Sequence, residues 1–125
     1  MTPRRLPDYL DHIHQAATDA CSFVEGLTLP DFLEDKRTQQ AVIMCLIIVG
    51  EAVTKVMDGH PDFVHANAHV PWHSMRGMRN RIAHGYFELD FDIVWDTVLT
   101  DAPELVYRLP ALIAAESVAD DRHPS

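Results

Sequence analysis

The amino-acid sequence predicts an all-α fold, a bundle of four main helices joined by short ones. Apolar residues recur at steps of three and four along several segments, which is the period of an amphipathic helix. No segment shows the alternation of apolar and polar residues that marks a half-buried strand. A chain of 125 residues is long enough for one domain with its own core. We expect this domain to span residues 1–117, and residues 118–125 to form a polar, disordered tail.

The first helix is expected over about residues 6–25. Pro7 and Asp8 suit its first turn, and Gly26 suits its end. Residues 29–33 should then form a connecting turn with two apolar anchors. The apolar positions that define this helix are Leu6, Tyr9, Leu10, Ile13, Ala17, Ala20 and Val24.

A second helix should run from near Asp35 to about Met57. Its middle, residues 41–49, is apolar on every side. Such a helix needs cover on every side, so part of it is expected to face a second subunit. The apolar run is too short for a membrane span, which takes about 20 residues. Glu51 follows the run, either as an acid on the helix surface or as the partner of a buried arginine.

A break at residues 58–61 ends this helix, and residues 62–70 should form a short helix or a loop. His65, His69 and His73 are spaced by four, but a proline interrupts the register and no carboxylate or cysteine completes a ligand set. We therefore expect no metal site. The two cysteines show no metal or redox spacing, and no signal peptide is visible, which favours a cytoplasmic protein.

The last helix should begin after Asp90, a good N-cap, and hold its apolar period to about residue 117. Pro103 and Pro110 interrupt its hydrogen bonding without breaking that period. Two alternatives follow. The segment is either one kinked helix or two helices, the second of which restarts at residues 101–104.

One short helix is expected over residues 71–86, with Pro71 in its first turn and Gly85 just past its end, where a positive φ is favoured. At about 100° per residue, Arg79 falls on the apolar side, where an isolated charge is costly. It must be paired or face a second surface. The apolar sector is Trp72, Met75, Met78 and Ile82, and the polar stripe is His73, Arg76, Asn80 and His84.

This stripe has two interpretations. The arginines could form a solvated basic face, with His84 as a cation that complements the helix dipole. Alternatively, they form a phosphodiester site, because the guanidinium group fits phosphate and histidine can move a proton near neutral pH. The net charge of −9 argues against general nucleic-acid binding. RNA would have to be met at the local positive stretch of residues 71–86.

Residues 79–86, Arg-Asn-Arg-Ile-Ala-His-Gly-Tyr, resemble the Arg-x4-His-x-Tyr motif of HepT-like toxins, which belong to the HEPN superfamily of small helical ribonucleases. The flanks match the pattern of that family too. They are Gly50-Glu51-Ala52 upstream, Pro71-Trp72 just before the motif, and Tyr86-Phe87 and residues 92–95 after it. The resemblance covers roughly residues 6–115.

The resemblance implies a HEPN-type bundle that forms a homodimer, and a metal-independent endoribonuclease toxin without a cofactor. The 2′-hydroxyl of the RNA would attack the adjacent phosphate. His84 would act as general base or acid, Arg79 would stabilise the transition state, and Asn80 would orient the phosphate or His84. Arg76 and His73 would extend the surface that binds the substrate.

Tyr86 matches the family tyrosine to which a cognate minimal nucleotidyltransferase, the antitoxin, transfers AMP. The added negative charge would block the site, whereas the simpler role of Tyr86 is an aromatic anchor after the helix. A second function stays open, a non-catalytic partner that binds a nucleotide or presents substrate to the nucleotidyltransferase. A purely structural dimerisation module would leave the polar stripe unexplained.

Overall fold

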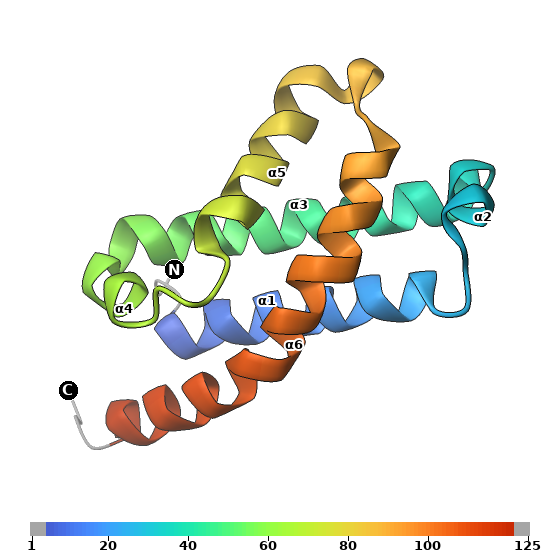
Figure 1. Ribbon diagram of the computed structural model, residues 1–125. Coiled ribbons are helices and arrows are strands. Elements are labelled where there is room, and N and C mark those ends of the chain that lie inside the picture. Colours follow the sequence, from blue (N-terminus) through green and yellow to red (C-terminus); the bar gives the residue numbers. More distant parts are fainter. Residues whose placement is uncertain (1–4, 122–125) are drawn as a thin grey trace.

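The computed structural model describes residues 5–121, which contain four long helices and three short ones joined by short connections (Figure 1). The predicted all-α class is confirmed, and these residues contain no strand. The elements are α1 (Leu6–Val24), α2 (Leu29–Leu33), α3 (Lys36–Gly59), α4 (Pro61–Ala66), α5 (Trp72–Gly85), the 3-10 helix η1 (Tyr86–Glu88) and α6 (Phe91–Asp121).

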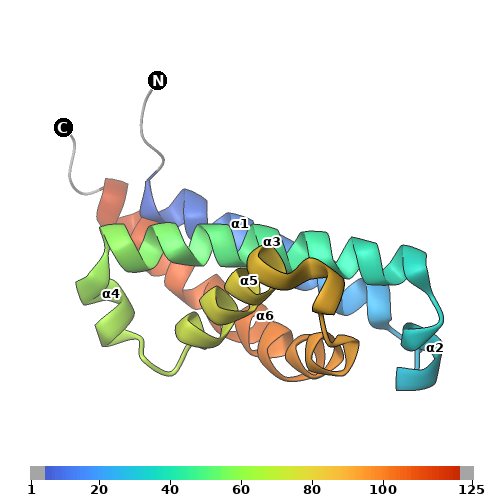
Figure 2. The same cartoon turned by 90° about the horizontal axis from the view of Figure 1, so that it is seen from above.

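Helices α1 and α3 lie side by side, and α5 and α6 cross this pair (Figures 1 and 2). Helix α6 packs mainly on α1, whereas α5 packs on α3. Every long helix therefore contributes one apolar face to a single core. The largest fully buried side chains are Trp72, Phe32, Leu10, Ile13, Leu46, Met75, Leu105 and Leu109.

The prediction of the end of α1 is confirmed. Gly26 has a φ of +79°, a left-handed conformation that glycine adopts without steric cost. The predicted turn at residues 29–33 is wrong, because this segment forms α2. The Thr28 hydroxyl accepts from the backbone N–H of Asp31, whose carboxylate accepts from that of Thr28. This capping box stabilises a helix start that apolar spacing does not reveal.

Phe32 anchors α2 to the start of α6. Its ring is fully buried and lies 5.2 Å from the ring of Trp95 and 6.3 Å from that of Phe91, between centroids. Leu29 packs partly buried against the core as a second apolar anchor, whereas Leu33 is 45% exposed. Helix α2 is thereby held beside the N-terminal end of α6.

Helix α6 is one continuous helix that contains Pro103 and Pro110, and it changes direction along its length (Figure 1). The kinked-helix alternative is confirmed, and the restart at residues 101–104 is wrong. Asp90 caps the helix as expected, because its carboxylate accepts from the backbone N–H of Asp92 at 2.9 Å. The helix continues through residues 118–121 of the expected tail, and residues 122–125 lie outside the described chain.

Helix α3 is long and apolar enough to cross a membrane by length and composition alone. The whole helix thus meets a criterion that the run of residues 41–49 does not. However, 56% of its most apolar window is buried in the bundle. Such burial is typical of the core helix of a soluble protein.

Helices α3 and α5 approach each other closely at Gly50. A Cβ atom at this position would lie 2.8 Å from Cγ of Arg79, still closer to its Cβ, and 3.2 Å from the backbone oxygen of Met75. Because the Cβ and the backbone oxygen cannot swing aside, any side chain here would push α5 away. Gly50 therefore sets the distance between the two helices.

Replacing Gly50 with alanine should lower the free energy of unfolding by about 1–3 kcal/mol, because overpacking strains a close helix contact. Gly77→Ala is the matched control. Gly77 lies on α5 with open space around its position, so alanine should raise the free energy of unfolding by up to about 1 kcal/mol through helix propensity. Denaturant unfolding of both variants measures the difference. Equal stability of the two variants would contradict the close approach.

Candidate active site on helix α5

Helix α5 presents the predicted apolar sector to the core. Trp72, Met75, Met78 and Ile82 are all buried. The indole N–H of Trp72 donates to the backbone oxygen of Asn67 at 3.0 Å, which fixes the start of the helix. The rest of the helix surface is consequently directed to α3 or to solvent.

The two ends of α5 differ from the prediction. Pro71 is the residue just before the first turn, and Gly85 is the last helical residue, with φ of −150° and ψ of 50°. The expected positive φ at Gly85 is wrong, because the chain continues directly into η1 instead of turning through a left-handed cap. Tyr86 thus begins a new helical turn and is 44% exposed.

Arg79 faces α3 and finds a hydrogen-bond partner there, as its position on the apolar side requires. Its Nη2 donates to the hydroxyl oxygen of Thr54 at 2.8 Å, and that hydroxyl donates to the backbone oxygen of Gly50 at 2.8 Å. A threonine hydroxyl has one proton, which goes to Gly50, so its oxygen is left to accept from Arg79. This relay fixes the direction of the guanidinium group.

Glu51 is the second partner of Arg79, and its side chain is also 57% exposed, so both roles expected for it apply in part. Its carboxylate lies 3.4 Å from Nε of Arg79, an ion pair without hydrogen-bond geometry. The Nε atom is buried and makes no hydrogen bond to the described residues. With 24% of the side chain exposed, the guanidinium group is held against α3 while its edge still reaches solvent.

Asn80 and His84 lie on another side of the helix. Both are exposed, and their i, i+4 spacing places them side by side. His84 lies about 140° around the helix from Arg79 and about 7.5 Å further along its axis. His84 and Arg81 line a groove of about 280 Å³ that Arg79 does not line. One chain therefore does not bring Arg79 and His84 into contact.

Arg76 is already paired in the structure. Its Nη2 lies 2.6 Å from a carboxylate oxygen of Asp58 on α3, and His65 and His73 line a groove of about 280 Å³ around this pair. An exposed ion pair stabilises a protein by about 0–1 kcal/mol, so Arg76 can release Asp58 for a phosphate at small cost. Within residues 5–121, no group of three or more potential ligands gathers around a metal position.

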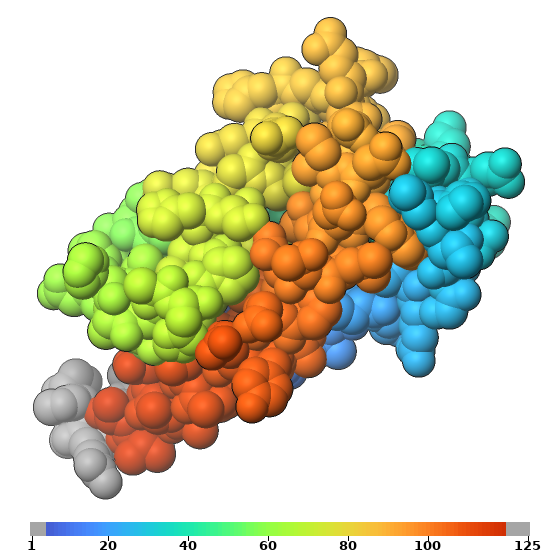
Figure 3. All heavy atoms as spheres, viewed as in Figure 1, coloured from blue at the N-terminus to red at the C-terminus, as the bar shows by residue number. Residues whose placement is uncertain are grey.

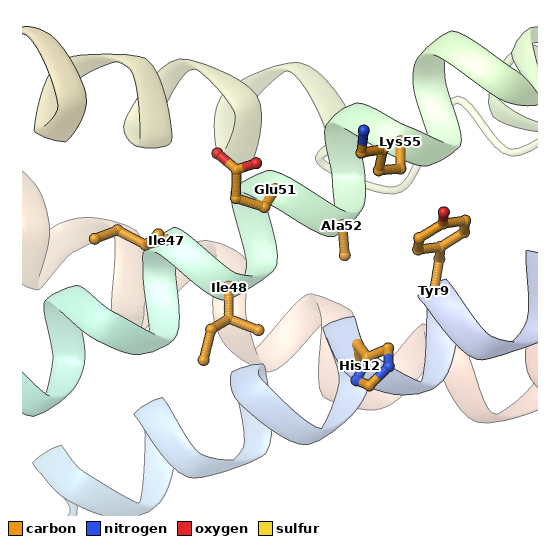
Figure 4. Close-up of a pocket in the computed structure, with 7 residues that line it drawn as sticks. All are labelled: Tyr9, His12, Ile47, Ile48, Glu51, Ala52 and Lys55. Atoms are coloured by element: carbon orange, nitrogen blue, oxygen red, sulfur yellow. The ribbon is translucent and has the colours of Figure 1, made fainter. Parts of the chain in front are cut away.

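A third groove, of about 320 Å³, runs between α1 and α3 (Figure 4). Figure 4 shows Tyr9 and His12 on α1, and the Glu51 carboxylate pointing away from α1. Along the same face of α3, Met44 is 56% exposed and Ile48 is 41% exposed. The bundle thus covers most of the apolar run but leaves a strip uncovered, and that strip leads to the partners of Arg79.

Thr54 is the site residue that sequence reasoning missed. It follows Gly50 by four positions and Glu51 by three, so all three lie on one side of α3. That spacing was the available signal. By contrast, burial raises the pKa of the Cys45 thiol to about 11 and also raises that of Cys21, which disfavours the thiolate form that a nucleophile needs.

Comparison with known proteins shows which family this chain resembles. The profile of the family described as ribonuclease HepT-like matches residues 13–112. A protein of Thermococcus cleftensis named probable ribonuclease HepT is 39% identical over 82% of this chain and 90% of its own length. A Methanocaldococcus jannaschii protein provisionally named as an RNase is 33% identical over 90% of this chain and 91% of its own length. No solved structure matches the chain.

Removing the Thr54 hydroxyl should release Arg79. In Thr54→Val, exchange of the Arg79 guanidinium protons should accelerate about tenfold or more, because a hydrogen bond to a charged group is worth about 1.5–3 kcal/mol. Thr54→Ser keeps the hydroxyl and should exchange as the unchanged protein does. Nitrogen-15 NMR of the arginine side chains measures this. Identical exchange in the valine and serine variants would show that the relay does not hold the side chain.

Proposed function

This chain belongs to the HepT-like ribonuclease family, and we propose that it is a metal-independent endoribonuclease, the toxin of a type II toxin–antitoxin system in the cytoplasm. The observation that carries the proposal is Arg79, a cation held in a fixed direction by α3 on the same helix as the exposed His84. Cleavage of RNA by its own 2′-hydroxyl needs one group to move protons and one to stabilise negative charge. These two side chains supply both.

The reaction proceeds in one displacement. The 2′-oxygen bonds to the adjacent phosphorus while the bond from phosphorus to the 5′-oxygen breaks, which leaves a 2′,3′-cyclic phosphate and a 5′-hydroxyl. A base takes the proton of the 2′-hydroxyl and an acid protonates the leaving oxygen. His84 serves in these transfers, Arg79 neutralises charge on the phosphorane-like transition state, and Asn80 orients the phosphate or His84.

The RNA would also contact the part of α5 that precedes the reacting groups. Arg76 and His73 lie one and two turns before Asn80, and both face the groove beside Asp58. In this proposal the RNA phosphate replaces the Asp58 carboxylate on Arg76. That exchange keeps the charge of the guanidinium group compensated, so binding costs little.

The active form is a homodimer in this proposal. One chain offers a single motif histidine, His84, for two proton transfers and holds Arg79 away from it. Met44 and Ile48 stay exposed on the α3 face that leads to Glu51, so a second copy seated there would bring its own motif helix near Arg79. Light scattering at micromolar concentration should give twice the chain mass. A monomer mass would contradict the arrangement.

The central test is cleavage of a defined RNA in EDTA. The product should carry a 2′,3′-cyclic end, and a substrate with a 2′-deoxy sugar at the cut position should stay intact. His84→Ala and Arg79→Ala should each lower the rate by about 10²–10⁴-fold while far-ultraviolet circular dichroism remains unchanged. Mass spectrometry of the product ends identifies the chemistry.

Failure of this test has distinct meanings. Cutting of the deoxy substrate, or full loss of activity in EDTA, would exclude attack by the 2′-hydroxyl without metal. Loss of helical signal in Arg79→Ala would instead give Arg79 a structural role. A protein that binds RNA or nucleotide without cutting any RNA would favour the second function, a non-catalytic partner of the nucleotidyltransferase.

Control of the activity is assigned to Tyr86 in this proposal. Its ring is 44% exposed and follows His84 by two positions, so another enzyme can reach it. Co-expression with the cognate minimal nucleotidyltransferase should add one or more AMP units to Tyr86 and abolish cleavage. Intact mass and peptide mapping check this. AMP on another residue would refute the scheme, and Tyr86→Phe should escape modification and stay active.

A further inference from the structure

The tip formed by η1 carries an aromatic ring that the described chain does not cover. Phe87 is fully exposed, and its ring meets that of Tyr86 edge to face, with centroids 5.8 Å apart. Figure 3 shows this yellow-orange segment standing out from the body of the molecule. Single exposed apolar residues are common on proteins, so the ring alone indicates nothing. Its surroundings are informative.

A groove of about 340 Å³ lies beside this ring. Its apolar wall comes from Tyr86, Phe87 and Phe91, and its other wall from α2 and the start of α3. That second wall carries hydrogen-bonding and charged groups. They belong to Glu34, Lys36, Gln39 and Gln40, next to Leu33. The Gln39 amide already donates to the backbone oxygens of Phe32 and Leu33. A flat, partly polar ligand would therefore find an aromatic surface on one side and the side chains of Lys36 and Gln40 on the other.

Charged side chains of both signs lie at the same end of α3. Lys36 and Arg37 occupy the first turn of the helix, both are exposed, and this turn contains no acidic residue. Cations are unfavourable at the positive end of a helix dipole, so these two do not serve the stability of α3. Glu34 and the Asp35 N-cap balance these two charges. Of the two cations, Lys36 lines the groove, where its ammonium group can pair with a phosphate.

From this combination we propose that the η1 tip and its groove bind a nucleobase of the RNA substrate, stacked on Phe87, with a backbone phosphate near Lys36 and Arg37. The inference rests on the proposed function and adds a binding position to it. Tyr86 lies two residues after His84. Within η1, Glu88 lines the groove of His84, whereas Tyr86 and Phe87 line the other groove. A single RNA strand can therefore pass from the reacting phosphate to Phe87.

Stacking predicts weak sequence preference at this position, because every base has a π-face. The site adds affinity for single-stranded RNA to a chain whose net charge of −9 provides little general attraction. An acidic or apolar protein partner could use the same surface. Such a partner would require no aromatic ring, and the experiment separates the two cases on that ground.

The test measures binding of a short fluorescent single-stranded RNA by anisotropy, with every protein in a His84→Ala background so that the probe stays intact. Phe87→Ala should weaken binding about five- to 150-fold, the range that loss of one stacked base corresponds to. Phe87→Trp should bind at least as tightly as phenylalanine. Phe87→Leu, which keeps apolar area but has no π-face, should bind as weakly as alanine.

Two controls accompany these variants. Tyr107 is 81% exposed on α6, far along the chain from η1, and Tyr107→Ala should leave binding unchanged. In Lys36→Gln, the slope of log affinity against log salt should fall by about 0.7, the contribution of one phosphate on a single strand.

Each outcome has one meaning. Equal RNA affinity of Phe87→Ala and its parent, or leucine as good as phenylalanine, overturns the nucleobase site and leaves the ribonuclease proposal intact. Absence of RNA binding by the His84→Ala parent, together with no cleavage of the same RNA by the unchanged protein, overturns both. Weak RNA binding by Phe87→Ala and Phe87→Leu, together with tight RNA binding by Phe87→Trp, supports stacking.

Discussion

The contact between Gly50 and Arg79 determines how closely α5 packs on α3 and where the Arg79 side chain lies. Without a side chain at Gly50, α5 settles close enough for the Arg79 guanidinium group to reach the Thr54 hydroxyl. The same hydroxyl is tied back to the Gly50 carbonyl, so one turn of α3 supplies both the space and the hydrogen bond. A bulkier residue at this one position would separate the helices and leave Arg79 without its partner.

Electrostatics explains why this arrangement is tolerated. A guanidinium group loses hydration when it is held against a neighbouring helix, and that loss must be offset by partners. Thr54 provides a neutral acceptor, and Glu51 lies 3.4 Å away, too far for a hydrogen bond to the buried Nε. Arg79 thus keeps more of its positive potential than a tight, bidentate carboxylate pair would allow, which suits its proposed role of attracting phosphate.

Several features of the surface agree with a site that is incomplete in one chain. Arg79 and His84 point in directions about 140° apart on α5. The uncovered strip of Met44 and Ile48 leads to the Arg79 partners, and the exposed tip at Phe87 lies beyond His84. A second chain at the strip and an RNA strand at the tip would cover both. In the proposed function, both surfaces are left exposed in one chain because the second chain and the RNA would cover them.

The sequence by itself determined where the long helices lie and which of them carries the candidate motif. Apolar periodicity, the Asp90 N-cap and Gly26 depend on neighbours within a few residues, so they are readable along the chain. The sequence also predicted that Arg79 needs a partner, but not which residue that partner is. Only the tertiary structure decided that Thr54 holds it, that Asp58 occupies Arg76, that Gly85 keeps a negative φ and that residues 29–33 form a helix. The physical reason is distance along the chain: Thr54 and Arg79 are 25 residues apart, and they meet only because α3 and α5 pack at Gly50.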